Sequence, residues 1–309
     1  MMKTNHIQWL ALAVLLLLTA GCPVDVNTTK PDGGDDGGDP ECPKTELATV
    51  RFFHGAGGTP VTRPEFGPAT TRNLNVVRMD PADELVTVTS LIAGRASVVQ
   101  LCGNKTLTLG ARLAGAKADR ATMQIMLTPD ADSAALDVGT TIVLAGIADA
   151  LEADGVTPEN PASVANPLRF ITVPDTFSAG AETQIQVVHA SRKTPTPVDV
   201  EVNPDSAGAD LLALARYEVS AVQPTKGTAD TAPVAVPVTF LEADMAKASF
   251  SIAPRMPAGA KGLAIHFDTE VFDPDHPDPA KRSPAPTARL FLTGDDPLLG
   301  LVAGGGITF

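Results

Sequence analysis

The chain of 309 residues has few aromatic side chains and no surplus of positive charge. It contains one tryptophan and one tyrosine, and its acidic residues outnumber its lysines and arginines by 36 to 23, which gives a formal charge of −13. Binding to nucleic acid requires clustered basic residues, and sugar-binding surfaces are commonly built on tryptophan and tyrosine. We therefore expect no nucleic-acid partner, and the composition disfavours a carbohydrate ligand.

The N-terminal apolar run is too short to span a membrane as a helix. It covers Trp9–Leu18, whereas a spanning helix needs about 20 apolar residues. Lys3 precedes it, and Leu18–Cys22 follows with the sequence Leu-Thr-Ala-Gly-Cys, in which small residues lead directly into a cysteine. This pattern is typical of a bacterial lipoprotein signal. It predicts a signal peptide over 1–21 and a lipid on Cys22, with an uncleaved signal anchor as the alternative.

The segment 22–45 is expected to be a flexible tether between this anchor and the folded part. Its centre, Pro31–Pro40, contains only proline, glycine and aspartate. Such a composition cannot bury a core, and the like charges extend the chain. A calcium loop is the alternative, but the spacing of the aspartates does not match the EF-hand pattern. Because Pro23 rather than aspartate follows Cys22, we expect an exported protein at the outer membrane, facing the periplasm or the cell surface.

Cysteine is scarce, and only three occur. With Cys22 acylated, Cys42 and Cys102 remain, an even number that predicts one disulfide in an oxidising compartment. Two independent thiols are the alternative. Two cysteines without a nearby histidine pair do not make a metal site, so we predict neither a metal nor a cofactor.

Two parts of the chain have similar sequences. Glu46–Pro60 aligns with Ala181–Pro195 when His54 is placed on His189. Further along, Gly139–Gly146 resembles Gly259–His266, and a segment at 168–175 resembles one at 288–295. The spacing is too long for a solenoid repeat and suits a duplicated domain. We predict one domain over 46–178 and a second over 179–309.

Short alternating segments predict an all-β fold. In Thr106–Leu113, leucine and alanine alternate with threonine, glycine and arginine, as expected for a strand with one buried face. With 26 glycines and 27 prolines as punctuation, these spacings favour antiparallel β-sandwiches over βαβ units. We expect a helical turn at Leu211–Ala215 and a final strand at Ile307–Phe309. The other strands are expected at 74–79, 85–89, 97–101, 123–127, 141–145, 169–173, 185–189, 198–202, 234–240, 248–252, 263–267 and 289–292.

The second repeat resembles a bacterial family of domains of unknown function. That family opens with Val-x-x-x-His-Ala-Ser-Pro and leads into a Val-Asp-Val strand, and this chain has His189-Ala190-Ser191 followed by Val198-Asp199-Val200. Arg192 stands where proline is usual, and the first repeat departs further, with His54-Gly55-Ala56. The resemblance implies two tandem Ig-like sandwiches, often in secreted or lipid-anchored proteins, and it implies no activity.

Candidate site residues are few. His54 and His189 occupy equivalent positions, and a catalytic group rarely duplicates with its domain, so we expect both to be structural. A hydrolase that uses His189 with Asp199, or a metal held by the acidic loop at 273–278, is the enzymatic alternative. No nucleophile motif completes either arrangement.

The sequence therefore favours a non-enzymatic, membrane-anchored lipoprotein that presents two sandwiches for binding, adhesion or envelope architecture. Its expected partners are the membrane, through the lipid, and a protein or other component of the envelope. An enzyme and a small-ligand carrier or sensor are the alternatives.

Overall fold

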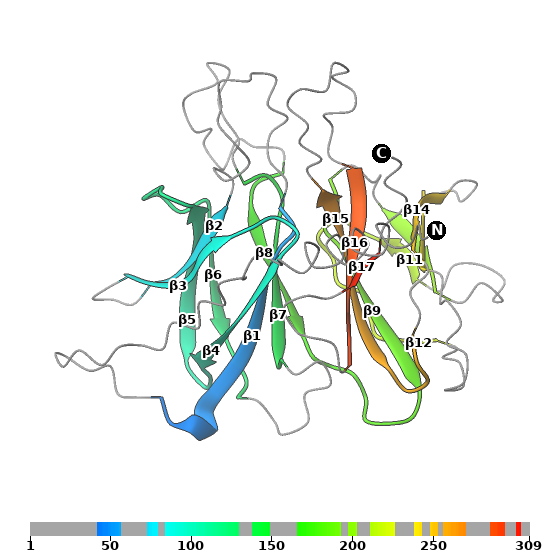
Figure 1. Ribbon diagram of the computed structural model, residues 1–309, viewed down its shortest axis with the longest axis horizontal. Helices are drawn as coiled ribbons and strands as arrows, with labels where there is room; N and C mark the ends of the chain where they lie inside the picture. The colour runs from blue at the N-terminus through cyan, green and yellow to red at the C-terminus, as the bar shows by residue number, and fades with distance from the viewer. Residues whose placement is uncertain are drawn as a thin grey trace, which may run out of the picture. The chain divides into compact units, whose positions relative to one another are not determined.

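The computed structural model describes twelve stretches of the folded part, and nearly all of their regular structure is β-strand (Figure 1). A single 3-10 turn, η1 (Lys44–Glu46), precedes the first strand. Cys42–Phe309 forms one compact unit. The described residues are 42–56, 73–79, 84–129, 138–148, 166–192, 197–202, 211–225, 238–242, 248–252, 256–269, 285–293 and 301–303.

The strands between residues 47 and 174, here called repeat 1, form two four-stranded sheets. The inner sheet of repeat 1 has the order β4-β1-β7-β8, and the outer sheet has the order β3-β2-β5-β6. The strands are β1 (Leu47–His54), β2 (Leu74–Met79), β3 (Glu84–Leu91), β4 (Ala96–Cys102), β5 (Thr106–Leu113), β6 (Ala121–Met126), β7 (Thr140–Ala145) and β8 (Arg169–Pro174).

The strands between residues 183 and 303, repeat 2, form two further sheets. The inner sheet of repeat 2 has the order β12-β9-β15-β16-β17, and the outer sheet has the order β11-β10-β13-β14. The strands are β9 (Thr183–His189), β10 (Val198–Glu201), β11 (Leu211–Leu214), β12 (Gln223–Thr225), β13 (Val238–Glu242), β14 (Ala248–Ile252), β15 (Lys261–Thr269), β16 (Ala285–Leu292) and β17 (Leu301–Ala303).

The two repeats share one strand order, apart from the additional β17. In each, the first strand lies between the fourth and the seventh, and it pairs antiparallel with the fourth and parallel with the seventh. The predicted all-β fold with β-sandwiches is thus confirmed. An immunoglobulin constant domain pairs its first strand with its second, so the likeness to that domain lies in the sandwich architecture and not in the strand order.

Each repeat has its own apolar core between its two sheets. In repeat 1 this core contains Val50 and Phe52 of β1, Leu107 and Leu109 of β5, and Leu144 of β7, among others. The alternation along β5 therefore places the predicted leucines inside. The core of repeat 2 is built in the same way, from Ile185, Val187, Val198, Val200, Met256, Ala264 and Leu290, among others.

A third apolar cluster, the shared core, joins the inner sheets of the two repeats. Repeat 1 contributes Phe53, which meets Phe267 and Phe291 of repeat 2 edge-on at ring-centroid distances of 5.0 and 6.0 Å. A polar contact crosses the same boundary, since Arg289 Nη2 donates to the carbonyl of Gly94 at 2.6 Å. The inner sheets therefore have apolar residues on both faces.

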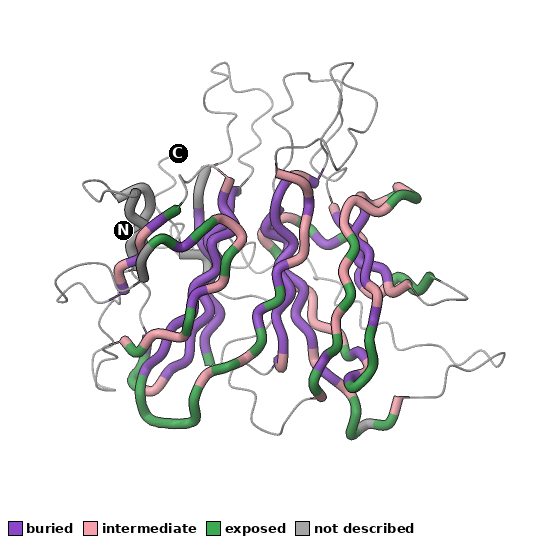
Figure 2. Tube along the Cα trace, turned by 180° about the vertical axis from the view of Figure 1, so that it is seen from behind, coloured by how far each residue is buried: buried purple, intermediate pink, exposed green. Residues whose placement is uncertain are grey.

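Burial along the strands follows from this two-sided packing. All six residues of β7 and all seven of β9 are buried, whereas β6 and β10 of the outer sheets alternate between more and less buried positions. Figure 2 shows buried residues along the strands of the inner sheets. The central strands β7 and β9 are therefore buried on both faces. The division into domains 46–178 and 179–309 stays a prediction.

One predicted element is wrong, and two others fall partly or wholly outside the described residues. Leu211–Leu214 is strand β11 rather than a helical turn, because it pairs with the edge of β10 and completes the outer sheet of repeat 2. Tertiary pairing here overrides the helical preference of a leucine- and alanine-rich segment. The strand expected at 234–240 is described only from Val238, and the one at Ile307–Phe309 lies outside the described residues.

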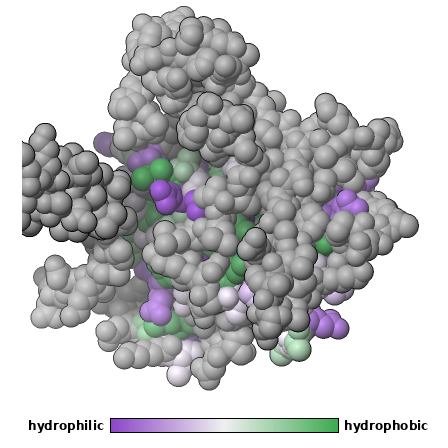
Figure 3. All heavy atoms as spheres, turned by 45° about the vertical axis from the view of Figure 1, so that its right-hand side comes forward, coloured by the Kyte–Doolittle hydropathy of each residue, from purple (hydrophilic) through white to green (hydrophobic). Residues whose placement is uncertain are grey.

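The described surface is mixed in character. Its large exposed apolar side chains are Leu85, Val86, Ile92 and Met126, all in repeat 1. On the face drawn in Figure 3, the described residues that are visible include both hydrophilic and hydrophobic groups. Within the described stretches, no helix has the length and apolar character to cross a bilayer.

Candidate functional site

The end of the first strand is the place where the equivalent histidines lie. In repeat 1, His54 is buried at the end of β1. Its backbone N–H donates to Arg95 O at 3.0 Å, and its carbonyl accepts from Gly94 N–H at 2.7 Å. The next residue, Gly55, donates to Leu144 O at 2.8 Å. These three hydrogen bonds fix the strand end against the turn before β4 and against β7.

Repeat 2 makes the same three hydrogen bonds with different residues. His189 donates to Glu218 O at 3.0 Å and accepts from Tyr217 N–H at 2.6 Å, and Ala190 donates to His266 O at 2.7 Å. The arrangement assigns Tyr217 to the position of Gly94, Glu218 to that of Arg95, and His266 to that of Leu144. The strand registers agree, because His54 lies opposite Leu144 and His189 opposite His266.

Side-chain contacts around this frame differ between the repeats. In repeat 2, the hydroxyl of Ser191 donates to one carboxylate oxygen of Asp268, and Arg192 N–H donates to the other at 2.7 Å. Asp268 is only 2% exposed, and Arg192 Nε lies 3.6 Å from its Oδ2 atom. In repeat 1 the equivalent residues are Ala56 and Gly146, which have no side-chain polar group. The serine and the aspartate are therefore replaced together.

His189 and His266 of repeat 2 are buried next to one another. The rings of His189 and His266 are stacked with their centroids 5.7 Å apart. His266 Nδ1 lies 2.9 Å from Thr287 O, which fixes the orientation of the ring. Burial lowers the pKa of His266 to about 4, although the hydrogen bond to Thr287 opposes this change. His266 is thus neutral at pH 7.

Arginine side chains surround the one tyrosine of the chain. Arg169 of β8 places its guanidinium carbon 4.1 Å from the centre of the Tyr217 ring, and the Tyr217 hydroxyl donates to Asn166 Oδ1 at 3.1 Å. Arg216 donates to Asn166 Oδ1 at 3.4 Å and, through Nε, to Ser191 O at 3.1 Å. We call Asn166, Arg169, Arg192, Arg216, Tyr217 and Asp268 the Tyr217 cluster. It takes residues from both repeats.

Burial and the neighbouring charges act in opposite directions on the pKa of Tyr217. Burial raises the pKa of Tyr217, the charges of Arg169, Arg216 and Arg192 lower it, and the charge of Asp268 raises it. Within the described part of the chain, three guanidinium groups therefore act on the phenol against one carboxylate. This local charge is opposite in sign to the net charge of the protein.

Tyr217 has a backbone conformation that bulky residues rarely adopt. Its φ is +70°, and the equivalent Gly94 in repeat 1 has a φ of +73°. For an L-residue this conformation costs about 1–2 kcal/mol relative to the right-handed region, whereas glycine adopts it freely. Repeat 2 therefore carries a strained tyrosine at a turn that repeat 1 builds with glycine.

The catalytic pair considered for a hydrolase is not brought together. Val198 and Val200 of β10 belong to the same core as Ile185 of β9, on the side toward which His189 also points. Asp199 alternates with these valines and faces the other side of its sheet, where its Oδ1 accepts from Ala213 N–H at 2.6 Å. The histidine and the aspartate thus lie on different sides of the outer sheet.

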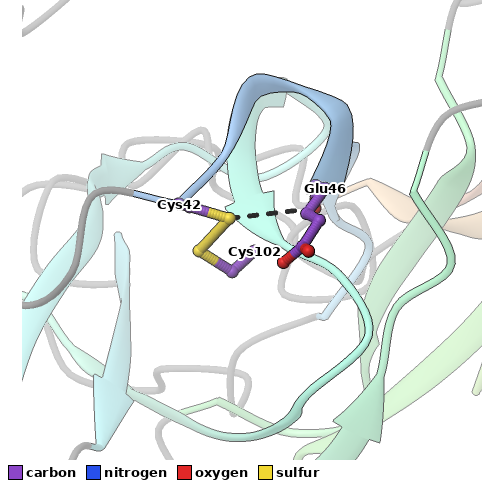
Figure 4. The surroundings of a disulfide bond; sticks show 3 residues. All are labelled: Cys42, Glu46 and Cys102. Carbon is purple, nitrogen blue, oxygen red and sulfur yellow. Dashed lines mark hydrogen bonds between the residues drawn. A yellow bond between two sulfur atoms is a disulfide. The ribbon is translucent and has the colours of Figure 1, made fainter.

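The other predicted site residues divide into those that the structure describes and those that it does not. Cys42 and Cys102 form a disulfide, with their Cα atoms 5.8 Å apart (Figure 4). The Sγ atom of Cys42 lies 3.8 Å from the carbonyl oxygen of Glu46. Cys22, the acidic tether and the 273–278 loop lie outside the described residues. Within the described ranges, no group of three histidine, cysteine, aspartate or glutamate side chains could hold a metal ion.

A small-ligand carrier with its site between the repeats would need a cavity there that admits the ligand. A cavity of about 10 Å³ does lie in the shared core, lined by Val138, Thr141, Val173, Phe177, Gln186 and Leu263, among others. This is the room that a single water molecule requires. The cavity does not support a carrier function.

Sequence reasoning missed the Tyr217 cluster. Two signals were present in the printed sequence: Tyr217 is the only tyrosine, and Arg192 replaces the proline usual in the motif that follows His189. Neither signal locates Arg169 or Asn166, because these residues precede β9 and reach the cluster only through the packing of the two repeats.

Comparisons with known proteins add little. No family model and no curated protein matches the chain. Among solved structures, the fimbrial anchor protein Mfa2 from Porphyromonas gingivalis aligns with 82% of this chain and 99% of its own, at 11% identity and a TM-score of 0.17. At this score the two chains are not shown to share a fold.

Proposed function

We propose that this protein is an exported lipoprotein, anchored through Cys22, that presents the two repeats as one non-enzymatic unit for binding or envelope architecture. The observation that carries the proposal is the position of the disulfide. Cys42, the first described residue, is bonded to Cys102 at the end of β4, directly after the acidic tether. Structural disulfides are typical of oxidising compartments outside the cytoplasm, and this one lies where a tether from a membrane anchor would enter the fold.

The shared core supports a platform rather than two loosely linked modules. A contact such as Phe53 with Phe267 and Phe291 buries large aromatic surface between the repeats. A fixed arrangement lowers the entropic cost of binding a partner across both repeats. The placement of His189 and Asp199 on different sides of a sheet supports a role without catalysis.

The equivalence of the two histidines also bears on the family resemblance. His54 and His189 each end the first strand of a repeat and make the same backbone hydrogen bonds. We propose that both repeats are members of the resembled family, with the outer membrane as their site of anchoring.

Membrane fractionation tests the anchor. Wild type and Cys22→Ser are expressed in a bacterium, and the mass of the N-terminal peptide is measured. We expect a diacylated Cys22 in the membrane fraction of wild type and loss of the lipid in the variant. An unmodified, unprocessed N-terminus in both would contradict the proposal.

Protease treatment of intact cells then tests which side of the outer membrane the protein faces. Cleavage within Pro31–Pro40 that releases a folded fragment from intact cells indicates the cell surface, and cleavage only after permeabilisation indicates the periplasm. Turnover of a broad substrate panel that His189→Gln or Asp199→Asn abolishes would contradict the non-enzymatic role.

A further inference from the structure

A buried glutamine of β9 has one polar atom without a partner among the described residues. Gln186 is 5% exposed, and its Nε2 donates to the carbonyl of Ser220 at 3.0 Å. This hydrogen bond fixes the orientation of the amide, because only its nitrogen can donate. The other atom, Oε1, is buried and accepts no hydrogen bond from the described part of the chain. A buried carbonyl oxygen of this kind costs free energy unless a donor reaches it.

Thr141 of β7 has the complementary group on the side of repeat 1. It is 2% exposed, and its Oγ1 accepts from Arg51 Nη1 at 3.1 Å. A hydroxyl also has one hydrogen to donate, and no hydrogen bond to a described residue uses the hydrogen of Thr141. Repeat 1 therefore contributes a buried donor, and repeat 2 contributes a buried acceptor.

Thr141 and Gln186 line the same cavity, the one of about 10 Å³ in the shared core. Apolar side chains make up much of the remaining wall, among them Val138, Val173 and Leu263. A space of this size holds one water molecule, and a buried water needs two to four polar partners. The size of the cavity and the two polar groups on its wall therefore suit the same occupant.

The reciprocal position in the shared core is filled by protein. Arg51 of repeat 1 lies over the ring of Phe291 of repeat 2, with its guanidinium carbon 4.1 Å from the ring centre. The strand registers make Gln186 the equivalent of Arg51. They also make Val173 the equivalent of Phe291. Both equivalents are the smaller residues, and both line the cavity, so the space lies where a shorter pair takes the place of the arginine and the phenylalanine.

We infer that this cavity is the binding site of one water molecule that bridges the two repeats, donating to Gln186 Oε1 and accepting from the Thr141 hydroxyl. A bridging water is nearly as favourable in enthalpy as a direct hydrogen bond. It satisfies the glutamine oxygen and adds a polar link to a boundary that is otherwise packed with apolar side chains. The inference concerns the joint between the repeats and is independent of the lipid anchor and of any partner.

Magnetic relaxation dispersion of the oxygen-17 nuclei of water tests the inference. This measurement counts the water molecules that stay bound for longer than the protein takes to tumble. It is applied to the full chain in detergent, as wild type and as Gln186→Met, which keeps a side chain of similar length but removes the acceptor. We expect the variant to hold one long-lived water fewer than wild type. An equal count in the two proteins overturns the inference.

Two further variants locate the water. Val173→Ile adds a methyl group to the cavity wall and keeps both polar partners, and it should also lose one long-lived water. It serves if Gln186→Met does not fold, and an unchanged count in it then overturns the inference. Gln184→Met is the matched control, because Gln184 is also buried on β9 but both of its amide atoms are bonded to Ser178. It should keep the wild-type count, and a loss equal to that in Gln186→Met overturns the inference.

Discussion

Repeat 1 and repeat 2 end their first strands in the same backbone frame, but they surround it with different chemistry. Where repeat 1 has Gly94, repeat 2 has Tyr217, and a buried Asp268 takes the place of Gly146. The backbone frame is therefore separable from the side chains that it positions. Repeat 1 has the three backbone hydrogen bonds alone. Repeat 2 adds polar side chains to them, and its Tyr217 adopts a strained backbone conformation.

Gly146 of repeat 1 stands where a side chain would clash with backbone. Its φ is +101°, and a side chain at this position would meet the carbonyl oxygen of Pro167, with the carbonyl carbon 2.8 Å away. The bridge between Ile147 and Pro167 holds that carbonyl in place. Repeat 1 therefore cannot accept the aspartate of repeat 2 without moving its backbone.

The largest expected effect follows from this difference. Gly146→Asp should lower the free energy of unfolding by more than about 4 kcal/mol, because a clash with backbone adds to a disfavoured φ. Urea denaturation of the full chain measures it. Gly115→Asp is the matched control, since its φ is +85° but a side chain there meets nothing within 4 Å. It should cost about 1 kcal/mol. Similar losses at the two sites would remove steric exclusion as the reason for the asymmetry.

The buried carboxylate of repeat 2 gives the next effect. Asp268→Ala leaves the Ser191 hydroxyl and the Arg192 N–H without their acceptor in a buried site, and it should cost about 4 kcal/mol. Glu84→Ala is the comparison in repeat 1. Glu84 accepts from Arg112 at 2.9 Å, but its side chain is 56% exposed, so its loss should cost less than about 1 kcal/mol. If the two variants have the same urea midpoint, burial does not decide how much each carboxylate contributes to stability.

The strands and the sandwich class could be predicted from the sequence because alternation is a local property. The prediction for Thr106–Leu113 matches β5 residue for residue, and so does that for β2 at Leu74–Met79. The alignment of the repeats was less accurate. The similarity of Gly139–Gly146 to Gly259–His266 matches Gly146 with His266, whereas the strand registers place Leu144 at that position. A shift of two residues keeps every side chain on its original face, so the apolar pattern cannot detect it.

The shared core and the Tyr217 cluster could not be predicted because they depend on contacts between distant segments. The continuous burial of β7 was visible in the sequence only as an apolar run, which fits a buried strand of any origin. Arg169 and Tyr217 come together through the packing of one repeat on the other. Nothing in the local sequence of either residue indicates the other.

The disulfide separates the repeats in another way, since only repeat 1 has one. Cys42 and Cys102 are 60 residues apart. Closing a loop of this length lowers the conformational entropy of the unfolded chain, which stabilises the folded protein by about 3–4 kcal/mol. Replacing both cysteines by serine should lower stability by this amount. Hydrogen exchange should quicken more in β1 and β4 than in β9 and β12. Equal acceleration in both repeats would indicate that the shared core makes the whole unit open together.

The smallest of the expected effects is a dependence on pH that repeat 2 has and repeat 1 lacks at the equivalent position. The pKa of His266 is about 4 in the folded protein, below its value of 6.5 in an unfolded chain. Above pH 6.5 the residue is neutral in both states and its titration has no effect on stability. Below pH 6.5 the unfolded chain takes up a proton that the folded protein does not, so stability falls, by about 3 kcal/mol at pH 4.

Urea denaturation between pH 8 and 4 measures this loss, and His266→Leu is the control because it installs the residue that repeat 1 has at Leu144. The variant should lose the part of the pH dependence of the free energy of unfolding that comes from His266. The leucine fills a similar volume in the core. If the free energy of unfolding of the variant falls with pH as steeply as that of wild type, other titratable groups cause the loss of stability in acid. A smaller dependence on pH in the variant would show that His266 contributes an ionisable group at the position where repeat 1 has the non-titrating Leu144, and that this difference is energetic as well as geometric.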